Sequence, residues 1–483
     1  MASSPDRRTA ALAIAATLLS AIAWWYGTSL QPLWWAAWLA PLPLLAVSPR
    51  LPARSAALAS LVAFAAGSLN QWYYLVEVIG LPGPAMAAIA ATTGLAMMLV
   101  VLLFRALAVR GHALAAAFSV PLAATGLSWL LALLSPHGTF GHIAYTQMDV
   151  PVLLQVAAVL GLWGVGFLVW LGSAALASAL CANADARARI RVACIGGGIL
   201  AVALAFGAWR LHDDAPTGQQ RVVLLDIGSG ADPAVDPDTV DGQRLLERYV
   251  AELERLADGQ RIDLAVLPES ALLLRERRLA PLQALADRHG MRIVVGAEDH
   301  SEAAKRNSAL VFSPAKEAPE VYFKRHLIPG FEARYAPGES RLMLAGSPAT
   351  GVAICKDLDF TATAREHARM GAQLLLVPAW DFGVDAWMHG RMAVMRGIEG
   401  GFAMARVARN GDLTLSDDRG RVLAEASAVD TRGPVSLVAD LPLRATRTPY
   451  RLWGDAFGAL CLALAVLLAA GPLRRRTRQP RHG

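Results

Sequence analysis

Cys355 is the residue best suited to covalent chemistry in this sequence. It ends a short apolar run, residues 351–354, and two charged residues follow it directly. The chain has four cysteines, and the other three lie within or at the ends of long apolar segments. A lone thiol has no nearby disulfide partner and no second cysteine with which to bind a metal. Cys355 is therefore either a buried structural thiol, which is the commoner role of a free cysteine, or a nucleophile.

Two other reactive side chains stand where apolar runs end. Glu269 follows the run 264–267, and Lys324 follows the run 320–323. Taken alone, each is more typical of a solvated surface group. The loops that follow the strands of an α/β sheet converge at one edge, however, so the three side chains can meet there. A Cys–Glu–Lys set suits acyl transfer through a thioester, because the carboxylate accepts the thiol proton while the ammonium favours the thiolate and stabilises an oxyanion.

The elements that must position these residues alternate along residues 217–447, the most charged part of the chain. Apolar runs predict strands at 221–226, 264–267, 291–297, 308–314, 320–323, 351–355, 374–377 and 402–408. Helical spacing predicts helices at 239–257, 278–289, 361–370 and 387–399. Continuously apolar strands are buried on both faces, so this alternation indicates an α/β layer fold.

The rest of the chain is far more apolar. Of its 483 residues, 55% are hydrophobic and 17% are charged, against roughly 25% charged in ordinary soluble domains. A membrane span needs roughly 20 apolar residues. Eight candidate spans lie at about 9–27, 32–48, 55–74, 83–105, 113–135, 152–181, 192–209 and 452–471. The second contains Pro41 and Pro43, so we expect it to be kinked or partly re-entrant.

These patterns predict four parts of the chain. They are a multi-span α-helical membrane domain of about seven helices at 1–212, a catalytic domain at 217–447, a last helix at 452–471, and a basic cytoplasmic tail at 472–483. The connections on one side carry the arginines, namely Arg7, Arg8, Arg50, Arg54, Arg105, Arg110, Arg187, Arg189 and Arg191, together with those of the tail. Those on the other side, near 28–31, 75–82 and 136–151, carry no Lys or Arg.

This asymmetry predicts the orientation of the protein. Positive charge stays on the cytoplasmic side, so both termini should be cytoplasmic and the catalytic domain extracytoplasmic. The same arginines account for the net charge of +6, so the charge does not indicate nucleic-acid binding. His137 and His142 lie in an outer loop. Contact with a substrate is one role for them, but we expect a solvated loop in which they are incidental.

Three segments resemble the signatures of the carbon–nitrogen hydrolase (nitrilase) superfamily, in the same order. They are Leu267-Pro268-Glu269-Ser270, Phe323-Lys324-Arg325-His326-Leu327-Ile328-Pro329 and Val352-Ala353-Ile354-Cys355. Segments 144–147, 153–155, 379–383 and 389–399 are similar to the membrane-bound branch of the superfamily that N-acylates lipoproteins. A soluble domain inserted before the last of eight spans resembles that branch too. The resemblance thus covers nearly the whole chain.

This resemblance implies an αββα sandwich in a multi-pass protein of the bacterial inner membrane, with no metal or cofactor. It implies that an acyl chain passes from a phospholipid to Cys355 and then to the N-terminal amine of a diacylglyceryl-cysteine lipoprotein, in a ping-pong sequence. Glu269 would be the general base and Lys324 the oxyanion stabiliser, with Glu332 helping to hold the site. Other residues implied to support the site or bind substrate are Lys356, Asp357, Trp380, Phe382 and Glu399.

Membrane spans suit a lipid substrate, because an acyl tail prefers hydrocarbon by about 0.8 kcal/mol per CH₂. The alternatives are a membrane-anchored hydrolase or amidase, an acyltransferase with another amine acceptor, and a non-catalytic scaffold. Lys356 and Asp357 stand where these acyltransferases typically have Tyr and Glu, and Gly330 and Phe331 are exchanged relative to their Pro-Phe-Gly-Glu. Lys356 either lowers the pKa of Cys355 or points to solvent, and the sequence leaves both open.

Overall fold

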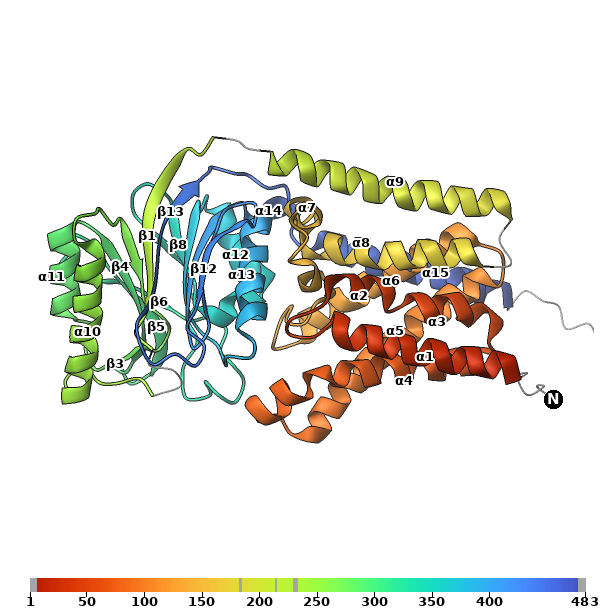
Figure 1. Cartoon of the computed structure of the whole chain (residues 1–483), viewed down its shortest axis with the longest axis horizontal. Coiled ribbons are helices and arrows are strands. Elements are labelled where there is room, and N and C mark those ends of the chain that lie inside the picture. The colour runs from red at the N-terminus through yellow and green to blue at the C-terminus, as the bar shows by residue number, and fades with distance from the viewer. Residues whose placement is uncertain (1–6, 182–184, 213–214, 229–232, 477–483) are drawn as a thin grey trace, which may run out of the picture. The chain divides into compact units, whose positions relative to one another are not determined.

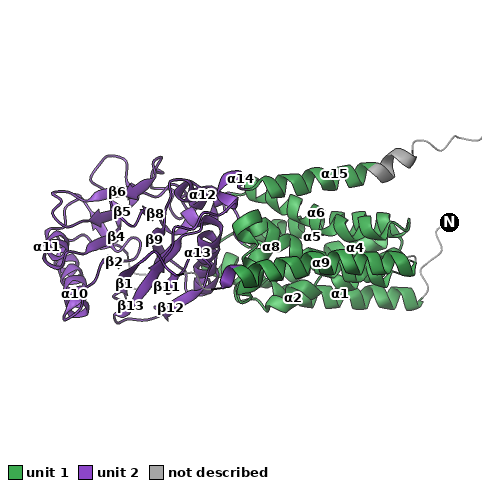
Figure 2. Ribbon diagram, turned by 90° about the horizontal axis from the view of Figure 1, so that it is seen from above, with its two compact units in different colours: residues 1–135, 141–209, 455–483 green, residues 136–140, 210–454 purple. Residues whose placement is uncertain are grey.

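The computed structural model describes residues 7–181, 185–212, 215–228 and 233–476 (Figure 1). The chain divides into two compact units (Figure 2). Unit 1 comprises residues 1–135, 141–209 and 455–483, and unit 2 comprises residues 136–140 and 210–454. The end of the predicted basic tail, with Arg478 and Arg481, lies outside the described residues.

Unit 1 is built of helices. They are α1 (Arg7–Gly27), α2 (Trp34–Leu39), α3 (Leu42–Val47), α4 (Ala53–Ser68), α5 (Gly83–Ala108), α6 (Ala113–Leu134), α7 (Pro151–Leu154), α8 (Ala157–Leu180), α9 (Ala186–Leu211) and α15 (Ala456–Arg476). Among the described residues, five helices are long and apolar enough to cross a membrane by length and composition: α1, α5, α6, α8 and α9. This supports a multi-span membrane protein, whereas the count of about eight spans is not confirmed.

The second predicted span is broken, as its prolines indicate. It consists of α2 and α3, which are separated at Ala40 and Pro41. Pro41 occupies the N-cap of α3, and Pro43 lies in its first turn. A proline is tolerated at a helix start but not in a helix interior, because it lacks an N–H group and its ring clashes with the preceding turn.

Within the described part of unit 2, the strands form two sheets. The first has the order β13–β1–β2–β4–β5–β6, with β3 paired to β4, and the second has the order β12–β11–β10–β9–β8–β7. The first sheet contains β1 (Gly218–Asp226), β2 (Leu264–Val266), β3 (Leu272–Leu274), β4 (Arg292–Asp299), β5 (Arg306–Phe312), β6 (Glu320–Phe323) and β13 (Val435–Leu443). The second contains β7 (Leu342–Leu344), β8 (Thr350–Val352), β9 (Leu374–Trp380), β10 (Ala403–Arg409), β11 (Asp412–Ser416) and β12 (Val422–Ser427).

Two pairs of helices cover the outer faces of these sheets. Helices α10 (Val240–Ala257) and α11 (Ala280–His289) pack on the first sheet, and α12 (Thr361–Arg369) and α13 (Ala386–Gly400) pack on the second (Figure 1). A short helix, α14 (Tyr450–Trp453), follows β13. The fold of unit 2 is therefore the αββα sandwich that the resemblance implied.

Strand β1 shows why the strands read as continuously apolar. Val222 and Leu224 face the second sheet, in the core between the two sheets. Val223 and Leu225 face the opposite way, into the core beneath α10 and α11. Both faces of the strand are thus dry, which abolishes the usual alternation of apolar and polar residues.

The three candidate catalytic residues each follow the carboxyl end of a strand. Strand β2 runs parallel to β4. Strand β5 is antiparallel to β4 and to β6, so β6 runs in the same direction as β2. Glu269 follows β2, Lys324 follows β6, and Cys355 follows β8.

Strands β3, β7, β11, β12 and β13 were not predicted. Much of β12 and β13 is partly exposed, so their sequences lack the long apolar run used to recognise the others.

Close packing at Gly296 fixes the backbone that carries Glu269. A Cβ at Gly296 would lie 2.4 Å from the Glu269 Cα and 2.5 Å from the Pro268 carbonyl oxygen. The Gly296 N–H also donates to that carbonyl at 3.1 Å. Backbone atoms on both sides leave no flexible group that can yield.

We therefore predict that Gly296→Ala destabilises the protein by about 1–3 kcal/mol, the usual cost of overpacking a core. The measurement is the thermal unfolding midpoint of the full-length protein in detergent. Gly218→Ala is the matched control, since a Cβ there meets nothing within 4 Å. Equal midpoints for the two variants would contradict this packing.

Candidate active site

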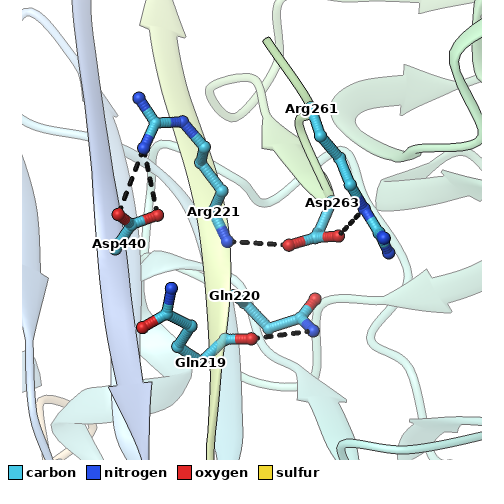
Figure 3. A pocket seen from close by; sticks show the side chains of 6 residues that line it. All are labelled: Gln219, Gln220, Arg221, Arg261, Asp263 and Asp440. Atoms are coloured by element: carbon cyan, nitrogen blue, oxygen red, sulfur yellow. Dashed lines mark hydrogen bonds and ion pairs between the residues drawn. The ribbon is translucent and has the colours of Figure 1, made fainter.

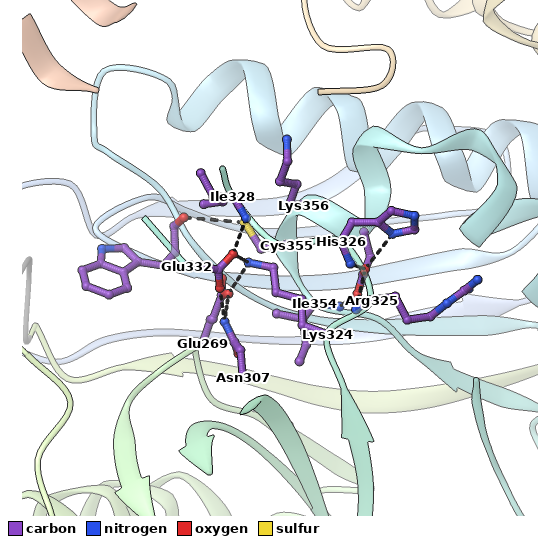
Figure 4. Close-up of polar contacts among 12 residues, drawn as sticks. Glu269, Asn307, Lys324, Arg325, His326, Ile328, Glu332, Ile354, Cys355 and Lys356 are labelled. Atoms are coloured by element: carbon purple, nitrogen blue, oxygen red, sulfur yellow. Dashed lines mark hydrogen bonds and ion pairs between the residues drawn. The ribbon is translucent and has the colours of Figure 1, made fainter. Parts of the chain in front are cut away.

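The centre of the candidate site is a buried ammonium held between two carboxylates (Figure 4). Lys324 Nζ donates to Glu269 Oε1 at 2.7 Å and to Glu332 Oε2 at 2.9 Å. The Lys324 residue is 1% exposed, and both glutamates are buried. Glu332 Oε2 also accepts from the Ile328 N–H at 2.7 Å, which fixes its orientation. The structure thus brings together two of the three predicted catalytic residues and the predicted second glutamate.

Asn307 completes this cluster and was not among the residues predicted from the sequence. Its Nδ2 donates to Glu269 Oε1 at 2.7 Å and to Glu332 Oε1 at 2.6 Å. Because ionised carboxylates only accept, the amide must present its nitrogen to them. Asn307 lies near the start of β5. In the sequence, the only hint of its role is a polar amide directly before a buried apolar strand.

The charges of this cluster depend on one another. Burial alone would lower the pKa of Lys324, but the Glu269 and Glu332 carboxylates outweigh it and hold that pKa well above its usual value. Burial raises the pKa of Glu269, the Lys324 ammonium opposes this shift, and the Glu332 carboxylate adds to it. The ammonium therefore stays charged at neutral pH, while Glu269 becomes a stronger base than an ordinary glutamate.

Cys355 lies at the start of a short 3₁₀ turn, Cys355–Asp359, directly after β8. Its backbone is left-handed, with φ +39°, and such a conformation costs a non-glycine residue on the order of 1–3 kcal/mol. Its Sγ lies 3.6 Å from the Trp380 carbonyl oxygen, to which the thiol donates. The residue as a whole is partly exposed.

The resting sulfur is a protonated thiol. Desolvation of the sulfur and the Glu269 carboxylate raise the pKa of Cys355 well above its usual value, and Lys324 lowers it only in part. The expectation that the ammonium favours the thiolate is confirmed for the effect of Lys324 itself, which burial and Glu269 outweigh. A base must remove the proton when the sulfur attacks.

Asp357 ties the Cys355 turn to the chain on either side of Lys324. Its Oδ1 accepts from the backbone N–H groups of Arg325 and His326 at 3.1 and 2.9 Å. Its Oδ2 accepts from the Tyr322 hydroxyl at 2.8 Å and from the Ile354 N–H at 3.1 Å. Burial would raise the pKa of Asp357, but these bonds and the neighbouring His326 hold it below its usual value. The carboxylate thus fixes the distance between two loops that carry reactive groups.

Lys356 fits neither of the two roles left open by the sequence. It is 5% exposed, so it does not point to solvent. Its Nζ donates to Asp359 Oδ2 at 2.9 Å and lies 3.2 Å from His137 Nδ1. It extends away from the carboxylate–ammonium cluster in Figure 4 and is not among the main causes of the pKa shift of Cys355.

The other predicted supporting residues are more dispersed. Trp380 supplies the carbonyl that accepts from Cys355, and the ring of Phe382 makes an edge contact with Phe331, with centroids 5.3 Å apart. Phe331 is 47% exposed, which leaves an apolar ring available beside Glu332. Glu399 is buried and pairs with Arg396 at 2.9 Å within α13.

A polar pocket elsewhere on unit 2 is a poor candidate site (Figure 3). It is lined by Gln219, Gln220, Arg221, Arg261, Asp263 and Asp440. Asp440 lies in β13, and the other five residues lie where β1 begins and just before β2, at the opposite strand ends from Glu269. Arg221 and Asp440 pair at 3.1 Å, with side chains 36% and 47% exposed, so they form an ordinary surface ion pair.

Comparison with known proteins accounts for both units. Residues 233–447 match the family model of the carbon–nitrogen hydrolases, and residues 20–175 match that of the apolipoprotein N-acyltransferase N-terminal domain. The apolipoprotein N-acyltransferase of Geobacter metallireducens is 26% identical over 398 residues, which are 74% of each chain. That of Methylococcus capsulatus is 29% identical over 379 residues, 71% of each chain. That of Allorhizobium ampelinum is 27% identical over 449 residues, 84% of this chain and 81% of the relative.

The chain belongs to the apolipoprotein N-acyltransferases. It contains a carbon–nitrogen hydrolase sandwich, as the motifs around Glu269, Lys324 and Cys355 predicted. It also contains an apolar helical part, as its long apolar segments predicted. It is a membrane protein by the same findings. In this chain the charged pair that follows the cysteine has two separate tasks: Asp357 holds the loop of Lys324, and Lys356 pairs with Asp359.

We predict that Asp357→Asn lowers the free energy of unfolding by about 2–3 kcal/mol at pH 7, because several hydrogen bonds lose a charged acceptor. A carboxylate whose pKa is depressed by folding stabilises the protein above its unfolded pKa of about 3.9 and loses that effect as the pH falls. The difference between wild type and variant, measured by denaturant unfolding, should therefore shrink below about pH 4. Asp258→Asn, at an exposed position, is the control. A pH-independent difference would contradict this assignment.

Proposed function

We propose that this protein N-acylates lipoproteins, by moving an acyl chain from a phospholipid through a Cys355 thioester to the N-terminal amine of a diacylglyceryl-cysteine. The observation that carries the proposal is the desolvated Glu269–Lys324–Glu332 cluster, whose charges act on the Cys355 sulfur. A buried ammonium paired with a carboxylate, together with a thiol whose pKa both groups shift, suits acyl transfer. The membership of the chain in a family of N-acyltransferases supports the nature of the acceptor.

The first half-reaction forms the thioester. Glu269 accepts the thiol proton as the sulfur attacks the ester carbonyl of the phospholipid, and the carbonyl oxygen becomes an oxyanion. Lys324 stabilises that oxyanion, since it remains charged in a site with little water. The C–O bond of the ester then breaks, the proton passes from Glu269 to the departing alkoxide, and a lysophospholipid leaves.

The second half-reaction transfers the chain to nitrogen. The neutral α-amine of the lipoprotein attacks the thioester carbonyl, and Glu269 accepts a proton from that amine. The C–S bond breaks to give an amide, and the sulfur regains a proton. Glu332 and Asn307 hold Glu269 and Lys324 in place throughout, because both carboxylates accept from the same amide and the same ammonium.

The apolar parts of the chain favour a lipid donor over a soluble amide. A membrane protein meets phospholipid esters at high local concentration, and a tail of about 16 carbons that stays in hydrocarbon avoids a large transfer cost. The exposed Phe331 ring, in edge contact with Phe382, gives an acyl chain an apolar partner beside the cluster. We further propose an inner-membrane location with the termini cytoplasmic and unit 2 extracytoplasmic, on the arginine distribution of the loops.

The direct test uses the full-length protein in detergent with acyl-labelled phospholipid and a diacylglyceryl peptide. We expect labelled triacylated peptide, and an acyl-enzyme at Cys355 when the peptide is omitted. Cys355→Ala should lower the rate by at least about 10⁴-fold, the scale seen when a nucleophile is removed. Cys194→Ala, which removes an exposed thiol in α9, should retain full activity.

Other products would identify the alternatives. Free fatty acid without acylated peptide would indicate a hydrolase in which water is the acceptor. A different acylated amine would indicate another acceptor. Absence of label on Cys355, with Cys355→Ala matching wild type, would leave only a scaffold.

The rate of acyl-enzyme formation should also fall at acid pH. Glu269 acts as a base only when it is ionised, and its pKa is raised, chiefly by burial. The acid limb of the pH–rate profile should therefore lie above about 4.5, the region of an ordinary glutamate. Rapid-quench measurement of labelled Cys355 between pH 4 and 8 checks this point. A limb at or below the ordinary value would exclude Glu269 as the base.

A further inference from the structure

Residues 136–140 occupy an unexpected place. In sequence they lie between α6, which ends at Leu134, and the 3₁₀ helix Ile143–Gln147, both parts of unit 1. By their contacts they belong to unit 2. The expected solvated loop is wrong for the middle of this segment, because Gly138 and Thr139 are buried, although His137 is exposed.

The segment is bound to the last residue of the 3₁₀ turn that begins at Cys355. The Asp359 carbonyl oxygen accepts from the Thr139 N–H at 2.9 Å and from the Thr139 hydroxyl at 2.7 Å. Gly138 allows this approach, since a Cβ there would lie 2.5 Å from the same carbonyl oxygen. Gly138 also has φ +52°, which favours glycine. Phe140 adds a ring contact to His389, with centroids 5.5 Å apart.

Lys356 makes the second connection between the segment and the turn. Its buried ammonium donates to Asp359 Oδ2 at 2.9 Å and lies 3.2 Å from His137 Nδ1. The ion pair spans one turn of chain, from the residue after Cys355 to the residue that Thr139 binds. The turn is thus held on one side by residues 136–140. On the other side its own Asp357 binds the backbone of Arg325 and His326.

A left-handed cysteine needs such restraint, because surrounding structure must hold a strained backbone in place. We infer that residues 136–140 position the nucleophile turn for the reaction, with Thr139 and Lys356 as positioning residues. Neither touches the reacting atoms. The inference rests on the proposed function only in taking Cys355 as the nucleophile.

The test compares Thr139→Val, which keeps the shape but loses the hydroxyl donor, with Thr139→Ser, which keeps the donor. Lys356→Met removes the charge at similar length, and Lys316→Met at an exposed site is its control. Two rates are measured on the full-length protein: acyl-enzyme formation with labelled phospholipid, and alkylation of Cys355 by iodoacetamide, followed on its peptide by mass spectrometry. Thermal unfolding midpoints establish that each variant is folded.

We expect Thr139→Val and Lys356→Met to lower kcat for acyl transfer by about tenfold, the effect of one lost hydrogen bond. The KM for phospholipid should stay within about twofold of wild type. Both variants should also change the alkylation rate at least about threefold, while Thr139→Ser and Lys316→Met match wild type. Alkylation needs no acyl donor, so it tests the positioning even if the proposed acyl transfer is wrong.

Three results would overturn the inference. The first is wild-type kcat and alkylation in both Thr139→Val and Lys356→Met. The second is a change in KM alone, which would indicate substrate binding. The third is equal impairment of Thr139→Ser and Thr139→Val, which would mean that packing at residue 139 matters and its hydroxyl does not. If Thr139→Val fails to fold, Lys356→Met decides.

Discussion

The site depends on keeping one ammonium charged where almost no water reaches it. Moving a single charge from water into a protein interior costs several kcal/mol unless other charges and hydrogen bonds compensate. Lys324 meets that requirement with two carboxylates, from Glu269 and Glu332, and Asn307 orients both of them. The arrangement leaves Glu269 more basic than an ordinary glutamate and the Cys355 thiol protonated at rest. Under the proposed function, this one cluster would supply both the base and the electrostatic partner of the oxyanion.

The nucleophile itself depends on a second constraint, which is mechanical. Cys355 has a left-handed backbone after a buried strand, and it begins a 3₁₀ helix of only 5 residues. Asp357 attaches the turn to the backbone that follows Lys324. Thr139 and Lys356 attach it to residues 136–140. The Cys355 turn is thus bound both to the segment after Lys324 and to residues 136–140.

The two units suit a reaction between a lipid and a protein terminus. The helical unit contains five described helices that are long and apolar enough to cross a membrane. The αββα unit supplies the charged cluster, which two sheets and their covering helices keep dry. A segment that separates two helices of unit 1 in sequence contributes to the turn of the nucleophile in unit 2. The surroundings of the candidate site therefore come from two separate stretches of the chain, residues 136–140 and residues 210–454.

The sequence by itself determined the class of the fold and selected Glu269, Lys324 and Cys355 as candidates for the site. Apolar runs that end at Glu269, Lys324 and Cys355 reflect strands buried on both faces, and that burial leaves a direct mark on composition. Pro41 and Pro43 likewise predicted a broken helix. Only the tertiary structure decided the partners of Asn307, the burial of Lys356 and the role of Thr139. Each depends on a residue that is distant in sequence, and contacts of that kind leave no local pattern to read.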